Sequence, residues 1–527
     1  MNPPLDNRQQ PIGYRKIIIE GMRGARDEFY TQPQVPSMRP NPFNAAATTA
    51  KTPSPMGTGF MKALGKLLPF DAIITREEAT RPYECDALSA YRQLPRVVVL
   101  PRTVEEVRAI MGLCHERGVP VVARGAGTGV CAGALPHETG VLLSLARLTT
   151  IGHIDPLNRT AQVQAGVRNL AISEAAAHHG LYYAPDPSSQ LACTVGGNIA
   201  ENAGGVHCLK YGLTVHNVLE LQVVTVQGEL VEIGGDAPDS PGFDLLALMI
   251  GSEGMLGVVV AATVRLLPVP ESVRLLLAAF DDVEKAGLAV GEIIAAGIIP
   301  AGLEMMDNPA IVAIEDYVHA GYPVEAAAVL LCDIDGDPQS VTQQVDAVRA
   351  LLIRHGATEV RLARDEAERE RLWRGRKSAF PAMGRIAADY YCMDGTIPRR
   401  RLPEVLSHIG QLSRKHGLPV ANVFHAGDGN LHPLIMYDAN RPDELARAEA
   451  FGAEILELCV AVGGTITGEH GVGVEKLGQM CVQFSPEELA QFRAVKDAFD
   501  PQGLLNPGKG IPTPRRCSEY RMFSGRE

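Results

Sequence analysis

A strand–helix–strand pattern near residue 98 constrains the fold of this chain more than any other local feature. The apolar run VVVLP is followed by TVEEVRAIMGLCHERG and then by VPVVARG. Thr103 is of a residue type that caps helix N-termini, and Gly118 stands where the helical periodicity ends. We therefore predict a strand, a capped helix and a second strand. Helical and strand patterns alternate again from about residue 270 to 460, so we expect an α+β protein.

Four histidines precede glycines at the ends of predicted helices. The segments AAAHHGLYYAP, LLIRHGATEV and LSRKHGLPV each end a helical pattern with His and Gly and continue as a strand. The helix dipole favours a histidine at that end. We therefore expect His178, His179, His355 and His416 to be helix-end residues, which leaves fewer histidines as candidate ligands.

The bulk composition excludes several classes of protein. A chain of 527 residues is too long for one ordinary core, so we expect two or more domains. The formal net charge of −12 argues against a nucleic-acid partner. No apolar run reaches the length of about 18 residues that a membrane span needs. The ten cysteines form no CxxC pair, which excludes the usual iron–sulfur spacings, and no secretory signal is evident. We expect reduced cysteines and a cytoplasmic protein.

Three glycine-rich segments follow one another within about 140 residues, and together they predict a large cofactor lying along backbone. The first, ARGAGTGVCAGALP, matches GxGxxA after a strand, but Gly133 and Pro136 interrupt the helix that a Rossmann fingerprint requires, so we reject NAD. As a nest of backbone N–H groups, the loop suits a diphosphate. The others are PDPSSQLACTVGGNIAENAGG and GSEGMLG. An ordinary loop-rich α+β domain is the alternative.

The segment FHAGDGNLHP predicts a hairpin that presents two histidines. If Asp428 and Gly429 form a two-residue turn, His425 lies directly opposite His432 and both rings share one face. Such a pair can hold a metal ion, although a strand histidine bonded to backbone is the alternative. Downstream, GGTITGEHGVG supplies Glu469, and two histidines with one carboxylate suit a divalent metal with open positions.

Six motifs in this order resemble those of the vanillyl-alcohol oxidase/p-cresol methylhydroxylase flavoprotein family. They are ARGAGTG, PDPSSQLACTVGGNIAENAGG, GSEGMLG, FHAGDGNLHP, GGTITGEHGVG and LLNPGKG. Within that family they are most similar to the FAD-binding subunits of glycolate oxidases and to the D-lactate and D-2-hydroxyglutarate dehydrogenases. The resemblance runs from about Phe70 to Pro512 and leaves the first 56 residues outside it.

The resemblance implies an FAD-binding domain of two α+β subdomains and an α+β cap domain over the flavin. We expect the chain to divide into a disordered or peripheral tail (1–56), a helical lead-in (57–94), the FAD-binding domain (95–270), the cap or substrate domain (271–460) and a C-terminal segment (461–527) that returns to the flavin. Thr128 stands where some family members tether flavin through a histidine, so the resemblance implies non-covalent FAD. The implied FAD contacts are Arg124, Gly125, Ala126, Gly127, Thr128, Gly129, Pro187, Ser188, Thr194, Gly196, Gly197, Asn198, Asn202, Gly204, Glu253, Gly257, Val258 and Asn506.

The resemblance also implies roles for residues at the reacting centre. In the hydroxyacid dehydrogenases, the residues that match His425, His432 and Glu469 bind a divalent metal. The identity of the ion is left undecided between zinc, manganese and iron. A metal would lower the pKa of a substrate hydroxyl. His470 could then take the hydroxyl proton while the flavin takes the hydride, or it could merely brace Glu469. Arg376, in the family's Leu-Trp-x-x-Arg pattern, would clamp the substrate carboxylate, or it could pair with a structural acid.

We therefore predict a flavin-dependent 2-hydroxyacid dehydrogenase. Leu434 replaces the asparagine of the 2-hydroxyglutarate enzymes, which favours glycolate or D-lactate over a dicarboxylate. The resemblance implies a second flavin-type subunit and an iron–sulfur subunit as partners, through which the protein could associate with the inner face of the cell membrane. A metallohydrolase and a non-catalytic FAD-binding assembly subunit are the alternative hypotheses.

Overall fold

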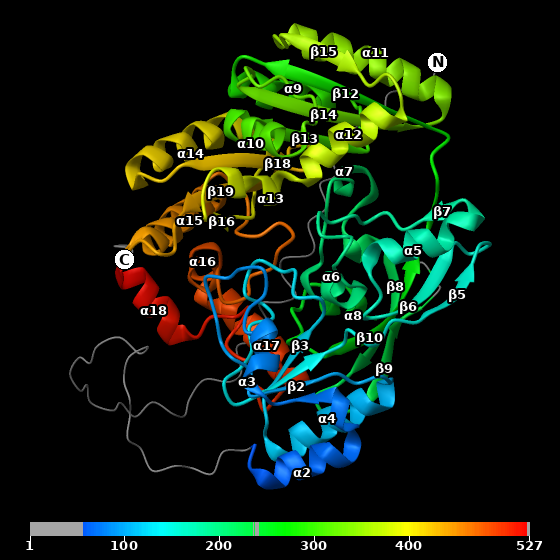
Figure 1. Cartoon of the computed structure of the whole chain (residues 1–527), viewed down its shortest axis with the longest axis vertical. Helices are drawn as coiled ribbons and strands as arrows, with labels where there is room; N and C mark the ends of the chain where they lie inside the picture. Colours follow the sequence, from blue (N-terminus) through cyan, green and yellow to red (C-terminus); the bar gives the residue numbers. More distant parts are fainter. Residues whose placement is uncertain (1–55, 236, 238–241, 524–527) are drawn as a thin grey trace, which may run out of the picture. The chain divides into compact units, whose positions relative to one another are not determined.

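The computed structural model describes residues 56–235, 237 and 242–523 (Figure 1). The predicted tail, residues 1–56, lies outside the described residues except for Met56. Helices and sheets are mixed along the described chain, which confirms the α+β prediction. None of the helices in this described part combines the length and the hydrophobicity that a membrane span requires.

The first sheet contains the strand–helix–strand unit that the sequence predicts. Its strand order is β1-β2-β4-β3, with β2, β4 and β3 parallel and β1 antiparallel to β2. The strands are β1 (Ile73–Ile74), β2 (Val97–Val99), β3 (Val121–Arg124) and β4 (Val141–Ser144). The helices around them are α2 (Thr58–Leu67), α3 (Glu77–Thr80) and α4 (Val104–Arg117). Thr103 Oγ1 accepts a hydrogen bond of 3.1 Å from Glu106 N, and Gly118 ends α4 at a φ of 62°.

The second sheet is antiparallel, with the order β5-β6-β10-β8-β9. Its strands are β5 (Ile151–Asp155), β6 (Thr160–Gln164), β8 (Val218–Val224), β9 (Leu230–Gly234) and β10 (Val258–Arg265), and β7 (Leu181–Tyr182) pairs with β11 (Leu267–Pro268) beside it. The helices of this part are α5 (Asn169–Ala176), α6 (Val195–Glu201), α7 (Cys208–Tyr211) and α8 (Leu245–Met249). Each of the first two sheets therefore has its own set of helices. The glycine-rich segments lie in the parts of the chain that connect the strands of these sheets.

A larger sheet of eight strands follows, with the order β15-β12-β14-β13-β18-β19-β16 and β17 paired to β19. Its strands are β12 (Ser272–Phe280), β13 (Gly302–Asp307), β14 (Ala328–Gly336), β15 (Glu359–Leu362), β16 (Asp389–Cys392), β17 (Gly395–Thr396), β18 (Val420–His425) and β19 (Asn430–Tyr437). The helices are α9 (Val283–Ala295), α10 (Asn308–Val318), α11 (Pro338–Arg354), α12 (Glu366–Lys377), α13 (Ala379–Ala382), α14 (Leu402–His416) and α15 (Glu444–Ala461).

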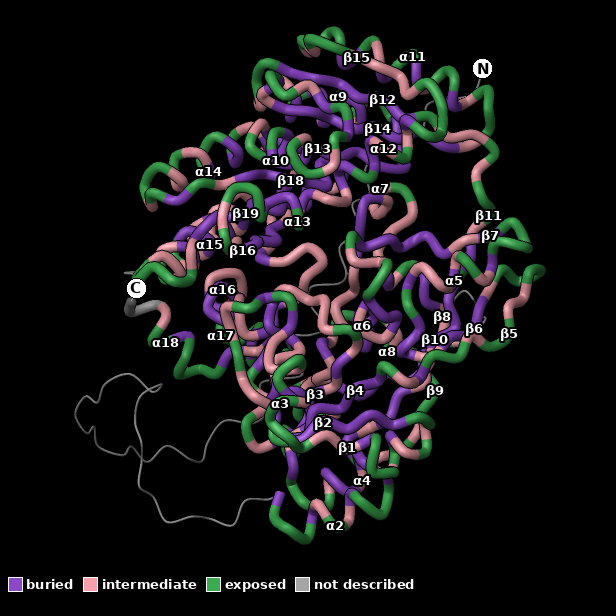
Figure 2. Tube along the Cα trace, viewed as in Figure 1, coloured by how far each residue is buried: buried purple, intermediate pink, exposed green. Residues whose placement is uncertain are grey.

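The central strands of this eight-stranded sheet, such as β13 and β14, are almost wholly buried (Figure 2). Along β12, Leu276 and Ala278 enter one hydrophobic core together with residues of α9, α11, α14 and α15. The alternate residues Leu275 and Leu277 enter a second core with residues of α10 and α12. Because successive strand side chains point to opposite faces, a continuous apolar run such as RLLLAAF supplies both cores.

The hairpin of β18 and β19 has a different register from the one predicted. Its loop contains four residues, 426–429, and His425 pairs with Asn430, while His432 pairs with Val423. The loop closes through a hydrogen bond of 3.1 Å from Gly429 N to His425 O, and Asp428 accepts one from Asn430 N. The predicted direct pairing of His425 with His432 is therefore wrong. Both histidines still lie on one face, because residues two apart on a strand share a face.

The C-terminal part of the chain returns to the first sheet. It contains α16 (Leu477–Gln483), α17 (Pro486–Phe499) and α18 (Pro514–Phe523). Leu505 forms a parallel bridge with Val121, and Asn506 N donates to Val121 O at 2.8 Å. Cys481 and Cys517 form a disulfide, so the prediction of reduced cysteines is wrong for this pair; sequence spacing gave no indication that residues 36 apart would meet.

Candidate active site

The three glycine-rich segments line one cavity of about 460 Å³, and residues from the second half of the chain contribute to the same wall. The wall includes His432, Glu469 and His470. The predicted cofactor residues that line it are Arg124, Gly125, Ala126, Gly127, Thr128, Gly129, Pro187, Ser188, Thr194, Gly196, Gly197, Asn198, Glu253, Gly257 and Val258. The structure thus brings loops that are far apart in sequence to one space beside the predicted metal ligands.

The cavity has features that suit a polar cofactor with a diphosphate. The backbone N–H groups of residues 126–129 donate no hydrogen bond within the described part of the chain. Gly127 has a φ of +72°, and a Cβ there would lie 2.0 Å from Arg124 Nη2, so the loop needs glycine. The buried atoms Thr194 Oγ1 and Glu201 Oε2 also have no hydrogen-bond partner among the described residues. Such unsatisfied groups in a cavity indicate a polar ligand, and a nest of N–H groups suits phosphate oxygens.

Three predicted cofactor residues lie outside the cavity wall and hold neighbouring segments. Asn202, which adopts a φ of 54°, accepts a hydrogen bond from Val215 N through its side chain. Gly204 N donates to Glu469 Oε2 at 3.0 Å. Asn506 Nδ2 donates to Gly133 O and to Glu253 O, at 3.1 and 2.7 Å. These residues connect the glycine-rich loops to one another and to the C-terminal part.

The predicted metal ligands His425, His432 and Glu469 lie together and are buried. The Nε2 atoms of the two histidines lie 3.1 and 2.9 Å from the same oxygen, Glu469 Oε1. Their rings are nearly perpendicular, with centroids 5.0 Å apart. His432 and Glu469 line the large cavity, whereas His425 and Glu469 line a second cavity of about 240 Å³. The set therefore separates two cavities.

The Nδ1 atom of each histidine contacts an oxygen acceptor. His425 Nδ1 lies 2.9 Å from both oxygens of Glu304, and His432 Nδ1 donates to Met393 O at 3.3 Å. An outer carboxylate or carbonyl that fixes the ring while Nε2 faces a common point is the usual arrangement around a metal. The donor set and these supports fit a divalent ion. The sequence analysis missed Glu304, although a glutamate inside the buried strand GLEMMD is a recognisable signal.

The charges of this cluster compensate one another. Burial alone would raise the pKa of Glu469, but His425 and His432 outweigh it and hold that pKa well below its usual range. Burial would likewise lower the pKa of His425, but Glu304 and Glu469 raise it well above the usual value. Arg376 forms an ion pair of 2.6 Å with Glu304, and both side chains are only 1% exposed.

The position of Arg376 differs from the predicted one. Arg376 is not among the residues that line the large cavity, and its guanidinium is paired with Glu304. The arrangement does not support a direct clamp on a substrate carboxylate; it corresponds to the alternative of pairing with a structural acid. Lys377, the next residue of α12, does line the cavity and lies 3.5 Å from Asp186.

The loop that carries Glu469 and His470 is organised by Asp394, another residue that the sequence analysis missed. The Asp394 carboxylate accepts hydrogen bonds from the backbone N–H groups of Gly468, Glu469 and His470. Lys476 Nζ forms an ion pair of 3.0 Å with it, and both side chains are fully buried. Burial alone would raise the pKa of Asp394, but Lys476 holds that pKa well below its usual range.

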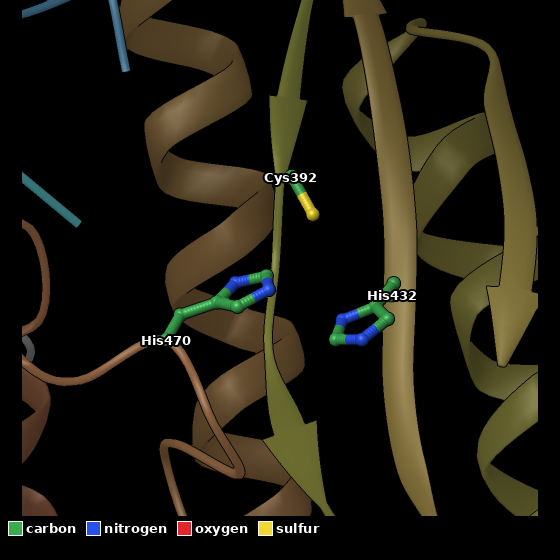
Figure 3. A group of neighbouring side chains, drawn as sticks. All are labelled: Cys392, His432 and His470. Atoms are coloured by element: carbon green, nitrogen blue, oxygen red, sulfur yellow. The ribbon is translucent and has the colours of Figure 1, made fainter. Parts of the chain in front are cut away.

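His470 stacks on His432 beside the cavity (Figure 3). Their ring centroids are 4.8 Å apart and the rings are 5° from parallel. Burial lowers the pKa of His470 to about 4, so its imidazole is neutral near pH 7. His470 Nδ1 has no hydrogen-bond partner among the described residues.

Comparisons with known proteins identify the family of the chain. Residues 95–234 match the family described as "FAD binding domain", and residues 269–510 match "FAD linked oxidases, C-terminal domain". Glycolate oxidase subunit GlcD of Escherichia coli (strain K12) is 63% identical, over 88% of this chain and 93% of that protein. Its counterpart in Bacillus subtilis (strain 168) is 41% identical, over 81% of this chain and 91% of that protein.

One further relative and one solved structure are more distantly similar to this chain. A D-lactate dehydrogenase of Anaerostipes hadrus is 32% identical, over 83% of this chain and 94% of that protein. The structure of p-cresol methylhydroxylase with substrate bound matches with a TM-score of 0.74 at 16% identity, over 87% of this chain and 97% of that one, which shows a shared fold.

The fold and the two matched families define an FAD-linked oxidoreductase. The chain belongs to the family of FAD-linked oxidases that includes the glycolate oxidase subunit GlcD.

Replacement of Asp394 by asparagine is predicted to destabilise the protein. The change leaves the Lys476 ammonium buried without its carboxylate, which costs about 3–5 kcal/mol of the free energy of unfolding. Urea unfolding followed by circular dichroism measures it. The double variant Asp394→Asn/Lys476→Met removes both charges and should recover most of the loss. An unchanged unfolding midpoint in the single variant would contradict the role assigned to Asp394.

Glu475 is predicted to make the stability of the protein fall with rising pH. Both of its carboxylate oxygens are buried without a hydrogen-bond partner among the described residues, and burial raises its pKa to about 8. The unfolded chain, with an ordinary glutamate pKa of about 4.3, loses this proton first, so the folded state is disfavoured between these two values and above them. Glu475→Gln should raise the free energy of unfolding by roughly 1–3 kcal/mol at pH 8.5 and by little at pH 5. The exposed Glu325→Gln is the matched control, and equal effects of Glu475→Gln at both pH values would contradict the assignment.

Proposed function

We propose that the protein is a flavin-dependent 2-hydroxyacid dehydrogenase that oxidises glycolate, and D-lactate as well, to the 2-oxo acid. The observation that carries this proposal is a single cavity whose wall contains both the glycine-rich FAD loops and the His432, Glu469 and His470 side chains. The relatives named glycolate oxidase subunit and D-lactate dehydrogenase support it.

The cavity-lining loops would hold FAD without a covalent bond. The N–H groups of residues 126–129 would bind the diphosphate, since they have no other partner within the described chain. When bound, the flavin supplies the acceptor for the hydride that leaves the α-carbon of the substrate. The chain itself provides the binding, the orientation and the exclusion of water.

His425, His432 and Glu469 would hold a divalent ion: zinc, manganese or iron. When bound, such an ion lowers the pKa of a substrate hydroxyl that coordinates it. Glu304 and the Met393 carbonyl would keep the two rings oriented through their Nδ1 atoms. We assign to His470 the acceptance of the hydroxyl proton, because it lies in the cavity wall directly against His432.

The surroundings of His432 favour a short monocarboxylate. The ring centroid of Phe380 lies 6.5 Å from that of His432 and 5.9 Å from that of Tyr390, so aromatic surface closes this side of the cavity. Leu434, two residues beyond His432 on β19, is buried and offers no polar atom for a second carboxylate. We assign the attraction of the single carboxylate to Lys377, which lines the cavity, and a positioning role to Arg376 through Glu304 and His425.

The proposed reaction needs an outside electron acceptor, because the sequence contains no CxxC pair of the kind that iron–sulfur clusters use. Relatives of the chain are named as subunits of an oxidase. We propose a second flavin-type subunit and an iron–sulfur subunit as partners, with the complex at the inner face of the cell membrane. The two alternatives predict other behaviour: a metallohydrolase would bind no flavin, and an assembly subunit would bind flavin that no hydroxy acid reduces.

His470→Asn tests the proposed reaction. The variant should retain FAD, because the three glycine-rich segments that line the cavity are unchanged. Glycolate should reduce that FAD about 10²–10⁴ times more slowly, because a general base is lost. Anaerobic stopped-flow absorbance measures the rate. His416→Asn, a helix-end histidine bonded to Glu454, is the matched control and should leave the rate unchanged.

Reduction of wild-type flavin by neither glycolate nor D-lactate would contradict the proposed activity. Reduction of the His470→Asn variant at the wild-type rate would instead contradict only the role of His470.

Glu469→Gln tests the proposed metal site. Loss of a charged ligand should weaken Mn²⁺ binding at least as much as the loss of an outer support does, by about 100-fold or more. Equilibrium dialysis with metal analysis measures it, and flavin absorbance verifies that the variant is folded. The control Glu454→Gln changes a glutamate that pairs with Lys415 and should bind Mn²⁺ like the wild type. Unchanged Mn²⁺ affinity in Glu469→Gln would contradict the assigned ligand set.

A further inference from the structure

The second cavity meets the buried metal set on a side that the FAD loops do not line. Its volume is about 240 Å³, and His425 and Glu469 form part of its wall. The rest of the wall comes from residues 205–216, from the loop of the β18–β19 hairpin, from Thr396 and from Gly468. None of the predicted FAD contacts lines it. The proposed reaction takes place in the large cavity and gives this second cavity no role.

The wall of the second cavity runs from exposed to buried residues. His216 is exposed, and Cys208 and Asp428 are half-buried. The side chains of His425 and Glu469 are only 4% and 9% exposed. A volume of about 240 Å³ is several times the roughly 30 Å³ that one water molecule takes. The cavity therefore has room for an ion with several waters between the surface and the metal set.

The polar groups of this wall are of the kind that binds cations. Its charged side chains are the carboxylates of Asp428 and Glu469, and no lysine or arginine of the described chain lines it. Asn430 is 5% exposed, and its Oδ1 atom has no hydrogen-bond partner among the described residues. A buried oxygen without a partner indicates a polar occupant. Carboxylate and amide oxygens are the ligands that hard divalent ions prefer.

The large cavity is a poorer route for a cation. In the proposed function it contains FAD and the anionic substrate, and its wall includes the cationic side chains of Arg124 and Lys377. We propose that the second cavity is the route by which a divalent cation reaches and leaves the His425–His432–Glu469 set, and that the oxygens of Asp428 and Asn430 attract the cation on its way. This route presupposes the metal set of the proposed function.

Groups along a route change rates in a way that distinguishes them from ligands. An obstruction slows entry and exit by the same factor, because the ion passes the same point in both directions, so the Kd stays unchanged. A carboxylate beside the route raises the local concentration of cations and therefore the association rate, and salt screens this effect.

Asp428→Asn tests the electrostatic part of the route. Stopped-flow fluorescence of a chelating indicator that Mn²⁺ quenches measures Mn²⁺ uptake by the FAD-loaded, metal-depleted full chain. The variant should take up Mn²⁺ about threefold to tenfold more slowly at low ionic strength, and the difference should shrink as salt is added. Asp86→Asn is the matched control: it removes a carboxylate from the wall of the large cavity and should leave the uptake rate unchanged.

His216→Trp tests the steric part. His216 Nδ1 accepts a hydrogen bond of 3.1 Å from Leu213 N, which holds the ring at the exposed part of the wall. The larger indole should slow Mn²⁺ uptake and Mn²⁺ release to excess chelator by the same factor, with an unchanged Kd in equilibrium dialysis. His216→Ala, which removes the ring, should slow neither rate. Flavin absorbance verifies that each variant is folded.

Wild-type rates in both Asp428→Asn and His216→Trp would overturn the route while leaving the metal set intact. Slower uptake in Asp86→Asn than in Asp428→Asn would also overturn it, because the ion would then enter through the large cavity. Absence of Mn²⁺ binding to the wild type at equilibrium would instead overturn the metal set itself, and the route with it. None of these measurements requires turnover.

Discussion

The buried carboxylate of Glu469 is the interaction on which the arrangement of the site depends. One of its oxygens lies between the Nε2 atoms of His425 and His432, and the other accepts a hydrogen bond from Gly204 N. It thereby joins a loop of the FAD-binding part, the hairpin of the eight-stranded sheet and the C-terminal segment. A buried anion is costly unless it is paired and hydrogen-bonded, so these segments are held in one relation to each other.

Two further buried ion pairs lie next to the Glu469 cluster. Glu304 lies behind His425 and is itself paired with Arg376, while Asp394 and Lys476 form a separate buried pair under the Glu469–His470 loop. Removal of one partner from such a pair leaves an uncompensated charge, which costs more than the pair contributes. This arrangement explains how a loop with a glycine on each side of Glu469 and His470 holds both side chains in place.

Local motifs could be predicted from the sequence, and long-range pairings could not. The helix between Thr103 and Gly118 is encoded within a short window, so it was predicted correctly. The second glycine-rich segment was predicted as a loop, but its residues Val195–Glu201 form α6. His425 and His432 were predicted on one face, but the register was wrong, because residues 426–429 form a four-residue loop instead of the assumed two-residue turn.

Glu304 and Asp394 acquire their roles only through the fold. Glu304 meets His425 across 121 residues, and Asp394 meets the backbone of His470 across 76. No short window contains such a pair. The motif around Arg376 was recognised from the sequence, but its partner Glu304 was not. The sequence therefore predicted a clamp on the substrate carboxylate, whereas the structure has a buried ion pair with Glu304.

The effect of metal on reduction of the bound flavin tests the role of the Glu469 cluster most directly. FAD-loaded protein would be depleted of metal, and its flavin absorbance recorded under anaerobic conditions while glycolate is added before and after Mn²⁺ is restored. If the cluster around Glu469 holds the ion that activates the substrate, bleaching is slow or absent in the depleted protein and rapid once Mn²⁺ is present. Equally rapid bleaching without metal would contradict the central claim that the cluster around Glu469 is a metal site that activates the substrate.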